Sequence, residues 1–377
     1  MSLMSAVSDT EIKAYTAAYE EFFLPKGGPK QLRDFLGTDP ALLGVHIVSF
    51  QDATLVSLYF PHVLMDGVAA VHLTNSWMLA LADRQDEIPT PLGIDVDPLA
   101  TIEQGQPKPG FLAPWQKAAL GWVYFGLRNL PRVLFSSREF RTIVIPAAHM
   151  KILRKRALKD LMTERETKEA TLPVLSDGDL ICAWLSRLCL AHLPKDSKKR
   201  AAVVNLVSLR RHAANPSDVV LNNIWDPVSA VMETRFIKNQ PIGQVASKIR
   251  TATKKAQTPE HLMSFATWWK SSRMGIPPVF ASPDMYVMGF SNMAHAKLFD
   301  LDFSAALPQG DARQPGASQP VKPVNIQVRV CGVEAFDGSW IIGKDEKGNY
   351  WLNCGTRKEN WPKIEELLAR ENVSSKL

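Results

Sequence analysis

Two short segments near the start of the chain are rich in β-branched and aromatic residues and predict a β-hairpin. They cover residues 45–50 and 54–60, and only Gln51, Asp52 and Ala53 separate them. Similar composition predicts strands further along, at residues 141–146, 201–208, 285–291, 296–303, 324–331, 334–340 and 349–354.

Helical periodicity marks several longer segments between these strands. The clearest is residues 177–192, which Ser176 or Asp177 caps. An apolar-rich helix is predicted directly after the hairpin, at residues 68–81. Further helices are expected at residues 9–23, 113–128, 147–165, 241–257 and 361–371.

Strands and helices mix along the whole chain, with several hairpin-like strand pairs. This arrangement predicts an α/β fold built on mixed sheets, of α+β character. The length of 377 residues suggests two domains, which we expect at residues 1–165 and 166–377.

The bulk composition is that of a soluble globular protein, with 46% hydrophobic and 22% charged residues. The net charge of +6 suits an anionic ligand such as a phosphorylated cofactor, or reflects surface bias alone. The predicted helix at 147–165 is basic and would suit nucleic acid, but its interleaved acids, Asp160 and Glu164, favour a solvated face. Because no helix-turn-helix, zinc or RNA-binding pattern appears, we expect no nucleic-acid partner.

Cysteine spacing and hydropathy argue against a metal-binding, a disulfide-stabilised and a membrane-spanning protein. The four cysteines form no CxxC pair and no zinc-finger spacing, so neither a metal site nor a disulfide framework is expected. The N-terminus lacks the pattern of a signal peptide. Charged residues and prolines interrupt the most apolar stretch, residues 111–135, so we expect no transmembrane segment. The cysteine pattern suits a reducing compartment, so the expected location is cytoplasmic, and the expected state is a monomer.

One motif carries chemistry. His62, Asp66 and Gly67 form an H-x-x-x-D-G pattern directly after a predicted strand, where a glycine-permitted turn can project a side chain into a cleft. An imidazole there can take the proton from an acceptor hydroxyl as its oxygen attacks a thioester carbonyl. Asp66 either orients His62, as in a catalytic triad, or forms a salt bridge that shapes the turn. We favour the salt bridge, because the Gly67 turn tends to point the two side chains apart.

The segment from Ser57 to Gly67, followed by an apolar helix with Trp77, resembles the BAHD-type acyltransferases. That family belongs to the superfamily of chloramphenicol acetyltransferase and of peptide-synthetase condensation domains. Later matches follow in the expected order: a capped helix with Trp184, a strand ending in arginine at 201–211, Asn222-Asn223, and a second signature at 298–304. The likeness covers the chain from about residue 40 onward and is closest to the fungal branch associated with secondary metabolism.

The resemblance implies a role for each matching position. His62 becomes the general base, and Asp66 and Gly67 become structural. Arg210 or Arg211 is the candidate cation for one of the aspartates. Asp302 is expected to hold a loop away from the reacting atoms. Ser291 and Asn292, at the predicted end of a strand, either donate to the oxyanion or are ordinary strand-end residues.

The expected reaction follows from these roles. An acyl group passes from acyl-CoA to the hydroxyl or amine of a small molecule, a secondary metabolite, in a channel between two chloramphenicol acetyltransferase-like domains. No permanently bound cofactor is required. The alternative is a catalytically inactive relative that binds a ligand in the same channel.

The sequence departs from the family pattern at three places, one of which is Met293, which stands where a Trp is usual. Ser304, Ala305 and Ala306 replace the usual Gly-Trp-Gly of the second signature. Only 61 residues precede His62, so part of the first domain's N-terminal half is expected to be missing, through a truncated gene model or a shortened natural variant.

Overall fold

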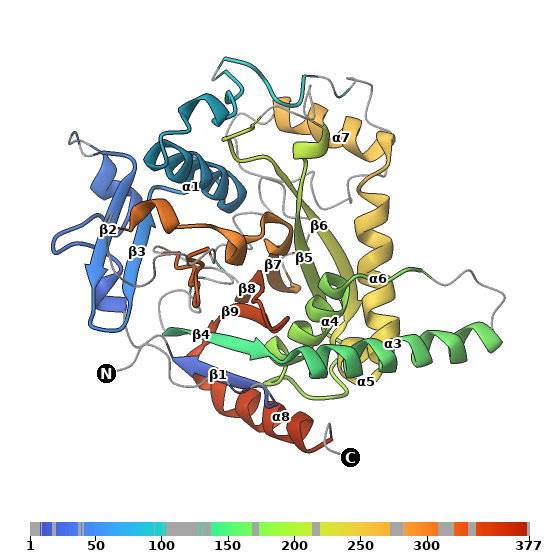
Figure 1. Cartoon of the computed structure of the whole chain (residues 1–377). Coiled ribbons are helices and arrows are strands. Elements are labelled where there is room, and N and C mark those ends of the chain that lie inside the picture. The colour runs from blue at the N-terminus through green and yellow to red at the C-terminus, as the bar shows by residue number, and fades with distance from the viewer. Residues whose placement is uncertain are drawn as a thin grey trace.

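The computed structural model describes residues 8–374 except 9, 17–19, 37–38, 40, 94, 101, 103–126, 128–129, 131–136, 168–172, 213–218, 272–281, 283, 308–319 and 331–336. A mixed seven-stranded sheet forms its centre, and a separate two-stranded sheet lies beside it (Figure 1). The large sheet has the order β1-β4-β9-β8-β7-β5-β6. Its strands are β1 (Lys13–Thr16), β4 (Arg138–Ile145), β5 (Arg200–Ser208), β6 (Trp225–Glu233), β7 (Tyr286–Asn292), β8 (Asp337–Lys344) and β9 (Tyr350–Arg357).

Three neighbouring strands, β5, β7 and β8, run parallel, so their C-terminal ends meet at one edge of the sheet. We call this the carboxyl edge; it contains Ser208, Asn292 and Lys344. Strand β4 runs in the same direction, because β9 pairs antiparallel with both β4 and β8. In sheets of this kind, ligands commonly bind beyond the carboxyl ends of the strands.

Helices cover one face of the sheet, and the alternation of side chains along each strand explains why. Ile143 and Ile145 of β4 point into the main core, whereas Val144 between them belongs to a cluster on the other face. The main core joins these strands to α3 (Ala147–Thr167), α4 (Asp177–Cys189), α6 (Ile242–Lys255) and α8 (Trp361–Ser374). The short helix α5 (Thr234–Asn239) links β6 to α6.

The predicted hairpin and the helix after it are confirmed. β2 (Gly44–Ser49) and β3 (Thr54–Tyr59) pair antiparallel, and α1 (Gly67–Leu81) follows. The helix predicted at 177–192 is also confirmed, as α4, with Ser176 as its N-cap. The one predicted at 113–128 falls almost wholly outside the described residues.

Several local predictions were wrong where tertiary pairing decided the conformation. The predicted helix at 9–23 contains strand β1, because Ile12 and Ala14 pack into the main core while Tyr15 packs on the opposite face. Residues 296–303 contain 3₁₀ turns rather than a strand. Within the described residues, 324–330 are irregular as well, and β6 and α7 (Pro259–Ser271) were missed.

The division at residues 165 and 166 stays a prediction. In the structure, β1 and β4 precede that position and pair within the same sheet as the strands that follow it. No helix among the described residues has the length and apolarity required to span a membrane.

Candidate active site

The H-x-x-x-D-G motif forms a tight turn followed by the start of α1. The amide of Leu64 donates to the carbonyl of Pro61 at 2.9 Å, which closes the turn after β3. Asp66 then caps α1, because its Oδ1 accepts from the amides of Val68 at 3.1 Å and Ala69 at 3.0 Å. A carboxylate at this position satisfies free amides of the first turn and complements the positive end of the helix dipole.

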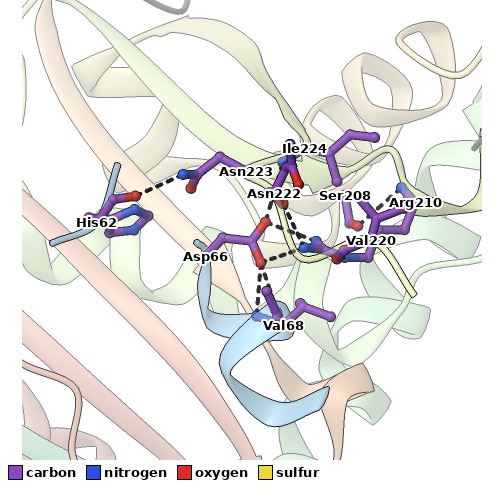
Figure 2. A network of polar contacts seen from close by, with 10 residues as sticks. His62, Asp66, Val68, Ser208, Arg210, Val220, Asn222, Asn223 and Ile224 are labelled. Carbon is purple, nitrogen blue, oxygen red and sulfur yellow. Dashed lines mark hydrogen bonds and ion pairs between the residues drawn. The ribbon is translucent and has the colours of Figure 1, made fainter. Parts of the chain in front are cut away.

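Arg210, at the carboxyl edge, forms a bidentate ion pair with the same carboxylate (Figure 2). Its Nη1 donates to Oδ2 of Asp66 at 2.8 Å and its Nη2 to Oδ1 at 2.7 Å. The side chains of Arg210 and Asp66 are only 15% and 11% exposed, so solvent screens the pair weakly. The amide of Ile224 also donates to Oδ2, at 3.4 Å.

The remaining donors of Arg210 hold the loop that follows β5. Its Nε donates to the carbonyl of Val220 at 3.2 Å, and Nη2 also donates to the carbonyl of Asn222 at 3.0 Å. Beneath this loop, Leu209 and Ile224 pack with Phe265 of α7 in a small apolar cluster. The cluster fixes the loop, and the loop fixes Asp66.

His62 lies on the other side of this arrangement. Figure 2 shows the Asp66 carboxylate pointing toward Arg210 and away from the imidazole of His62. The backbone carbonyl of His62 accepts from Nδ2 of Asn223 at 2.8 Å, which ties the turn to the loop after β5. The His62 side chain is exposed, and its ring makes no hydrogen bond within the described part of the chain.

The other predicted site residues lie at different positions in the fold. Arg211 donates through Nε to Nε2 of its neighbour His212 at 3.1 Å, so Arg210 rather than Arg211 pairs with Asp66. Asp302 is exposed, and its Oδ1 accepts from the amides of Ser304 at 2.9 Å and Val321 at 3.2 Å. Burial opposes ionisation of Asp302, but its hydrogen bonds with Ser304 prevail and lower its pKa. Asp302 thus holds a loop.

Ser291 and Asn292 end β7 at the carboxyl edge, as predicted, and both are half-buried. Oδ1 of Asn292 accepts from the amide of Ala294 at 3.0 Å. Its Nδ2 approaches the start of α4, where a Cβ added at Gly178 would lie 2.4 Å away. The glycine therefore leaves room for the Asn292 amide.

Two histidines that the sequence did not single out lie close enough to the Asp66–Arg210 pair for its charges to shift their pKa values. Burial, followed by the positive charge of Arg210, lowers the pKa of His72 on α1, while Asp66 opposes the shift. The same two causes lower the pKa of His295, which follows β7. Met293, two residues earlier, contacts Gly67: a Cβ there would lie 2.5 Å from its Sδ.

His295 lines a cavity of about 390 Å³ together with Lys297, Phe299, Lys344 and Tyr350. His62 lines neither this cavity nor the larger groove along α3. No group of three or more side chains suited to hold a metal ion occurs in the described ranges.

The model of the Transferase family matches residues 29–308. The chain is 31% identical to transcriptional regulator calD of Penicillium decumbens, covering 94% of this chain and 73% of that protein. It is 30% identical to acetyltransferase sphE of Aspergillus fumigatus, covering 96% of this chain and 73% of that one.

The fold is that of a solved fungal structure. TRI101 of F. graminearum, complexed with coenzyme A and T-2 mycotoxin, superimposes with a TM-score of 0.57 at 15% identity, over 86% of this chain and 67% of that chain. The expected mixed α/β architecture is thereby confirmed. With a family model that spans most of its length, the chain belongs to the Transferase family, the family of the BAHD-type acyltransferases that its motifs resemble.

Proposed function

We propose that the chain transfers an acyl group from acyl-CoA to a hydroxyl, or an amine, of a small-molecule secondary metabolite, with His62 as general base. One observation carries the proposal. Both oxygens of Asp66 are engaged by Arg210 and by the first amides of α1, so His62 has no carboxylate partner in the motif and stays available to accept a proton. The relative sphE, named an acetyltransferase, supports the same reaction class.

The proposed reaction is a direct transfer of the acyl group from the thioester to the acceptor. The acceptor oxygen attacks the thioester carbonyl carbon, a C–O bond forms, and its proton passes to an unprotonated ring nitrogen of His62. The tetrahedral intermediate then collapses, the C–S bond breaks, and the imidazolium returns the proton to the CoA thiolate. Ser291 and Asn292 are the proposed donors to the oxyanion.

We propose a cytoplasmic monomer in which residues 1–165 and 166–377 form two lobes around the channel. Asp302 and Gly67 serve the structure of the loops, and no resident cofactor takes part.

The direct test is acetyl transfer by the purified protein. Incubation with acetyl-CoA and a fungal metabolite extract should yield products with one added acetyl mass in the mass spectrometer. His62→Ala should abolish them, whereas His46→Ala, which changes an imidazole on the hairpin strand β2, should not. Transfer that persists in His62→Ala contradicts the assignment of the base.

A second candidate is a ligand-binding protein without transfer activity. The exposure of the His62 side chain and its absence from both cavities favour this alternative. Binding of CoA without acyl transfer to any component of the extract would decide for it.

A further inference from the structure

The helix α3 presents a solvent-exposed stripe on its outer face, while Met150, Leu153 and Ala157 on its inner face pack into the main core. In Figure 1 the second half of α3 projects beyond the helices that pack against it. The residues of the stripe recur at helical spacing and share an arc of about 100° around the helix axis. They are Lys151, Lys155, Leu158, Lys159 and Met162, and all five are exposed.

Positive charge dominates the stripe and the groove beside it. The groove has a volume of about 1020 Å³ and lies between α3 and the turn that joins β8 to β9. Asp177 is the one carboxylate among its described lining residues, and it already pairs with Arg154 and Lys344. Such a surface attracts an anionic partner. The cations that line the groove are Lys151, Arg154, Lys155, Lys159, Lys344 and Lys347.

The three lysines of the stripe form a ladder without an internal counter-charge. Lys151, Lys155 and Lys159 stand four residues apart, so each has a like charge one helical turn away, which destabilises a helix. No carboxylate in the described ranges pairs with any of them. Asp160 follows Lys159 in the sequence, but its Oδ2 accepts from the amide of Gly243 on α6 at 3.0 Å. A negatively charged surface against α3 would relieve the repulsion.

Two large apolar side chains lie among these lysines. Leu158 and Met162 are 53% and 60% exposed, and their spacing of four residues makes them neighbours on the helix surface. Lysines beside them can lay their methylene stems along an apolar layer and keep their ammonium groups in a polar one. The stripe thus combines the two properties of helices that lie in a membrane interface, basic charge and exposed apolar side chains.

The composition of the stripe favours a lipid surface over nucleic acid or protein. The phosphates of a duplex would pair with the lysines but would leave Leu158 and Met162 without an apolar partner. Protein interfaces are enriched in aromatic residues and arginine and depleted in lysine, whereas the stripe contains three lysines and no aromatic residue. Arg154, which lines the groove, is held by Asp177, so the attraction comes from the lysines as point charges.

We propose that α3 docks the protein on an anionic lipid bilayer, with the lysine ladder at the headgroups and Leu158 and Met162 inserted at the boundary of the acyl chains. This inference goes beyond the proposed acyl transfer and does not depend on it. The cytoplasmic leaflet, which contains phosphatidylserine, has the matching charge. Docking of this kind is reversible, because salt screens the attraction between the lysines and the headgroups.

Sedimentation with lipid vesicles tests the docking. The unmodified chain should bind vesicles of phosphatidylcholine that contain about one third phosphatidylserine, should not bind pure phosphatidylcholine, and should dissociate as NaCl is added. The ladder variant Lys151→Gln, Lys155→Gln and Lys159→Gln should lower the partition coefficient on the order of 100-fold, because three charges no longer meet the anionic surface. Equal partitioning of the ladder variant and the unmodified chain, or no binding to either kind of vesicle, overturns the inference.

A matched control makes the same change in net charge at the edge of the sheet opposite the carboxyl edge. Lys195→Gln, Lys358→Gln and Lys363→Gln alter three exposed lysines, which precede β5 or follow β9. This variant should partition to the phosphatidylserine vesicles as the unmodified chain does. A decrease equal to that of the ladder variant would assign the binding to overall charge and overturn the inference.

A second pair of variants tests the insertion of the apolar side chains. Leu158→Ala with Met162→Ala keeps every charge and should lower the partition coefficient about tenfold. The control pair, Leu32→Ala with Leu36→Ala, removes side chains that are 52% and 65% exposed before the hairpin, and should change it less than about twofold. Circular dichroism verifies that each variant is folded. Unchanged partitioning of the α3 pair would leave charge alone and overturn the inference.

Competition experiments separate the other possible occupants of the stripe. A short DNA duplex that binds through the ladder and that phosphatidylserine vesicles do not displace would assign the stripe to nucleic acid and overturn the inference. Poly-L-glutamate, a probe for an acidic protein, should be displaced by the vesicles, and its persistence on the ladder would likewise overturn the inference. Vesicle binding by a chain that lacks acetyl transfer activity would remove the proposed function and leave the docking intact.

Discussion

Arg210 holds both carboxylate oxygens of Asp66 from a position 144 residues further along the chain. The pair joins the start of α1 to the loop after β5, and it is largely shielded from water. Removing one partner of such a pair leaves the other charge buried without compensation, which costs more than the pair itself contributes.

Arg210→Ala should therefore lower the free energy of unfolding by about 3–5 kcal/mol, measured by urea denaturation. Arg210→Lys should recover only part of this loss, because an ammonium group cannot reproduce the bidentate geometry. Arg211→Ala is the control and should change stability by less than about 0.5 kcal/mol. Equal effects at 210 and 211 would show that the pair does not stabilise the fold.

Asn292 offers a way to separate an oxyanion donor from a structural side chain. Asn292→Asp keeps an acceptor for the Ala294 amide but removes the Nδ2 donor, whereas Asn292→Ala removes both. If the amide donates to the oxyanion, both variants should lower kcat about 100-fold with little change in KM. Near-normal kcat in Asn292→Asp would restrict Asn292 to a structural role.

His192 should make stability depend on pH. Burial, with the positive charge of Arg357, lowers the pKa of His192 to about 4 in the folded chain. Since the unfolded chain binds this proton first, its contribution is complete above about pH 6.5 and is lost as the pH falls toward 4. The loss should amount to about 2 kcal/mol after allowance for partial exposure.

The variant His192→Gln should flatten the slope of unfolding free energy between pH 6.5 and 4. Urea denaturation at several pH values checks this, with pH 8 as the reference at which neither protein titrates at this position. An unchanged slope in the variant would exclude His192 as its source.

Ser176 should contribute the stability typical of an N-cap. Its Oγ accepts from the amide of Asp179 at 3.2 Å, and the Asp179 carboxylate accepts from the Ser176 amide at 2.8 Å. Ser176→Ala should destabilise the fold by about 1 kcal/mol, and Ser176→Thr, which keeps a capping hydroxyl, by clearly less. Thermal unfolding followed by circular dichroism distinguishes the two variants.

The sequence was informative where local patterns decide structure. The hairpin β2–β3, the capped helix α4 and the motif at His62 follow from short-range spacing, and each was predicted near its observed position. The turn alone also favours a salt bridge for Asp66, but it does not indicate which arginine supplies the cation.

Long-range pairing explains most of the elements and contacts that the sequence did not predict. Strand β1 forms only because β4, more than 120 residues later in the chain, lies beside it. The edge strand β6 contains Pro227, a residue that argues against a strand when only the sequence is known. The proximity of His295 and His72 to Asp66 depends on the contact between Gly67, at the start of α1, and Met293, which follows β7. The sequence places Asp160 among the basic residues as part of a solvated face, whereas its carboxylate accepts from the amide of Gly243 on α6.

The hydrogen bonds of Arg210 within the protein limit how substrate preference can change. Four of the five guanidinium N–H groups have acceptors inside the protein, on Asp66, Val220 and Asn222. An arginine so committed has little left to offer an incoming molecule. Selection for new acceptors in the laboratory should therefore accumulate changes around the proposed channel while leaving positions 66 and 210 untouched.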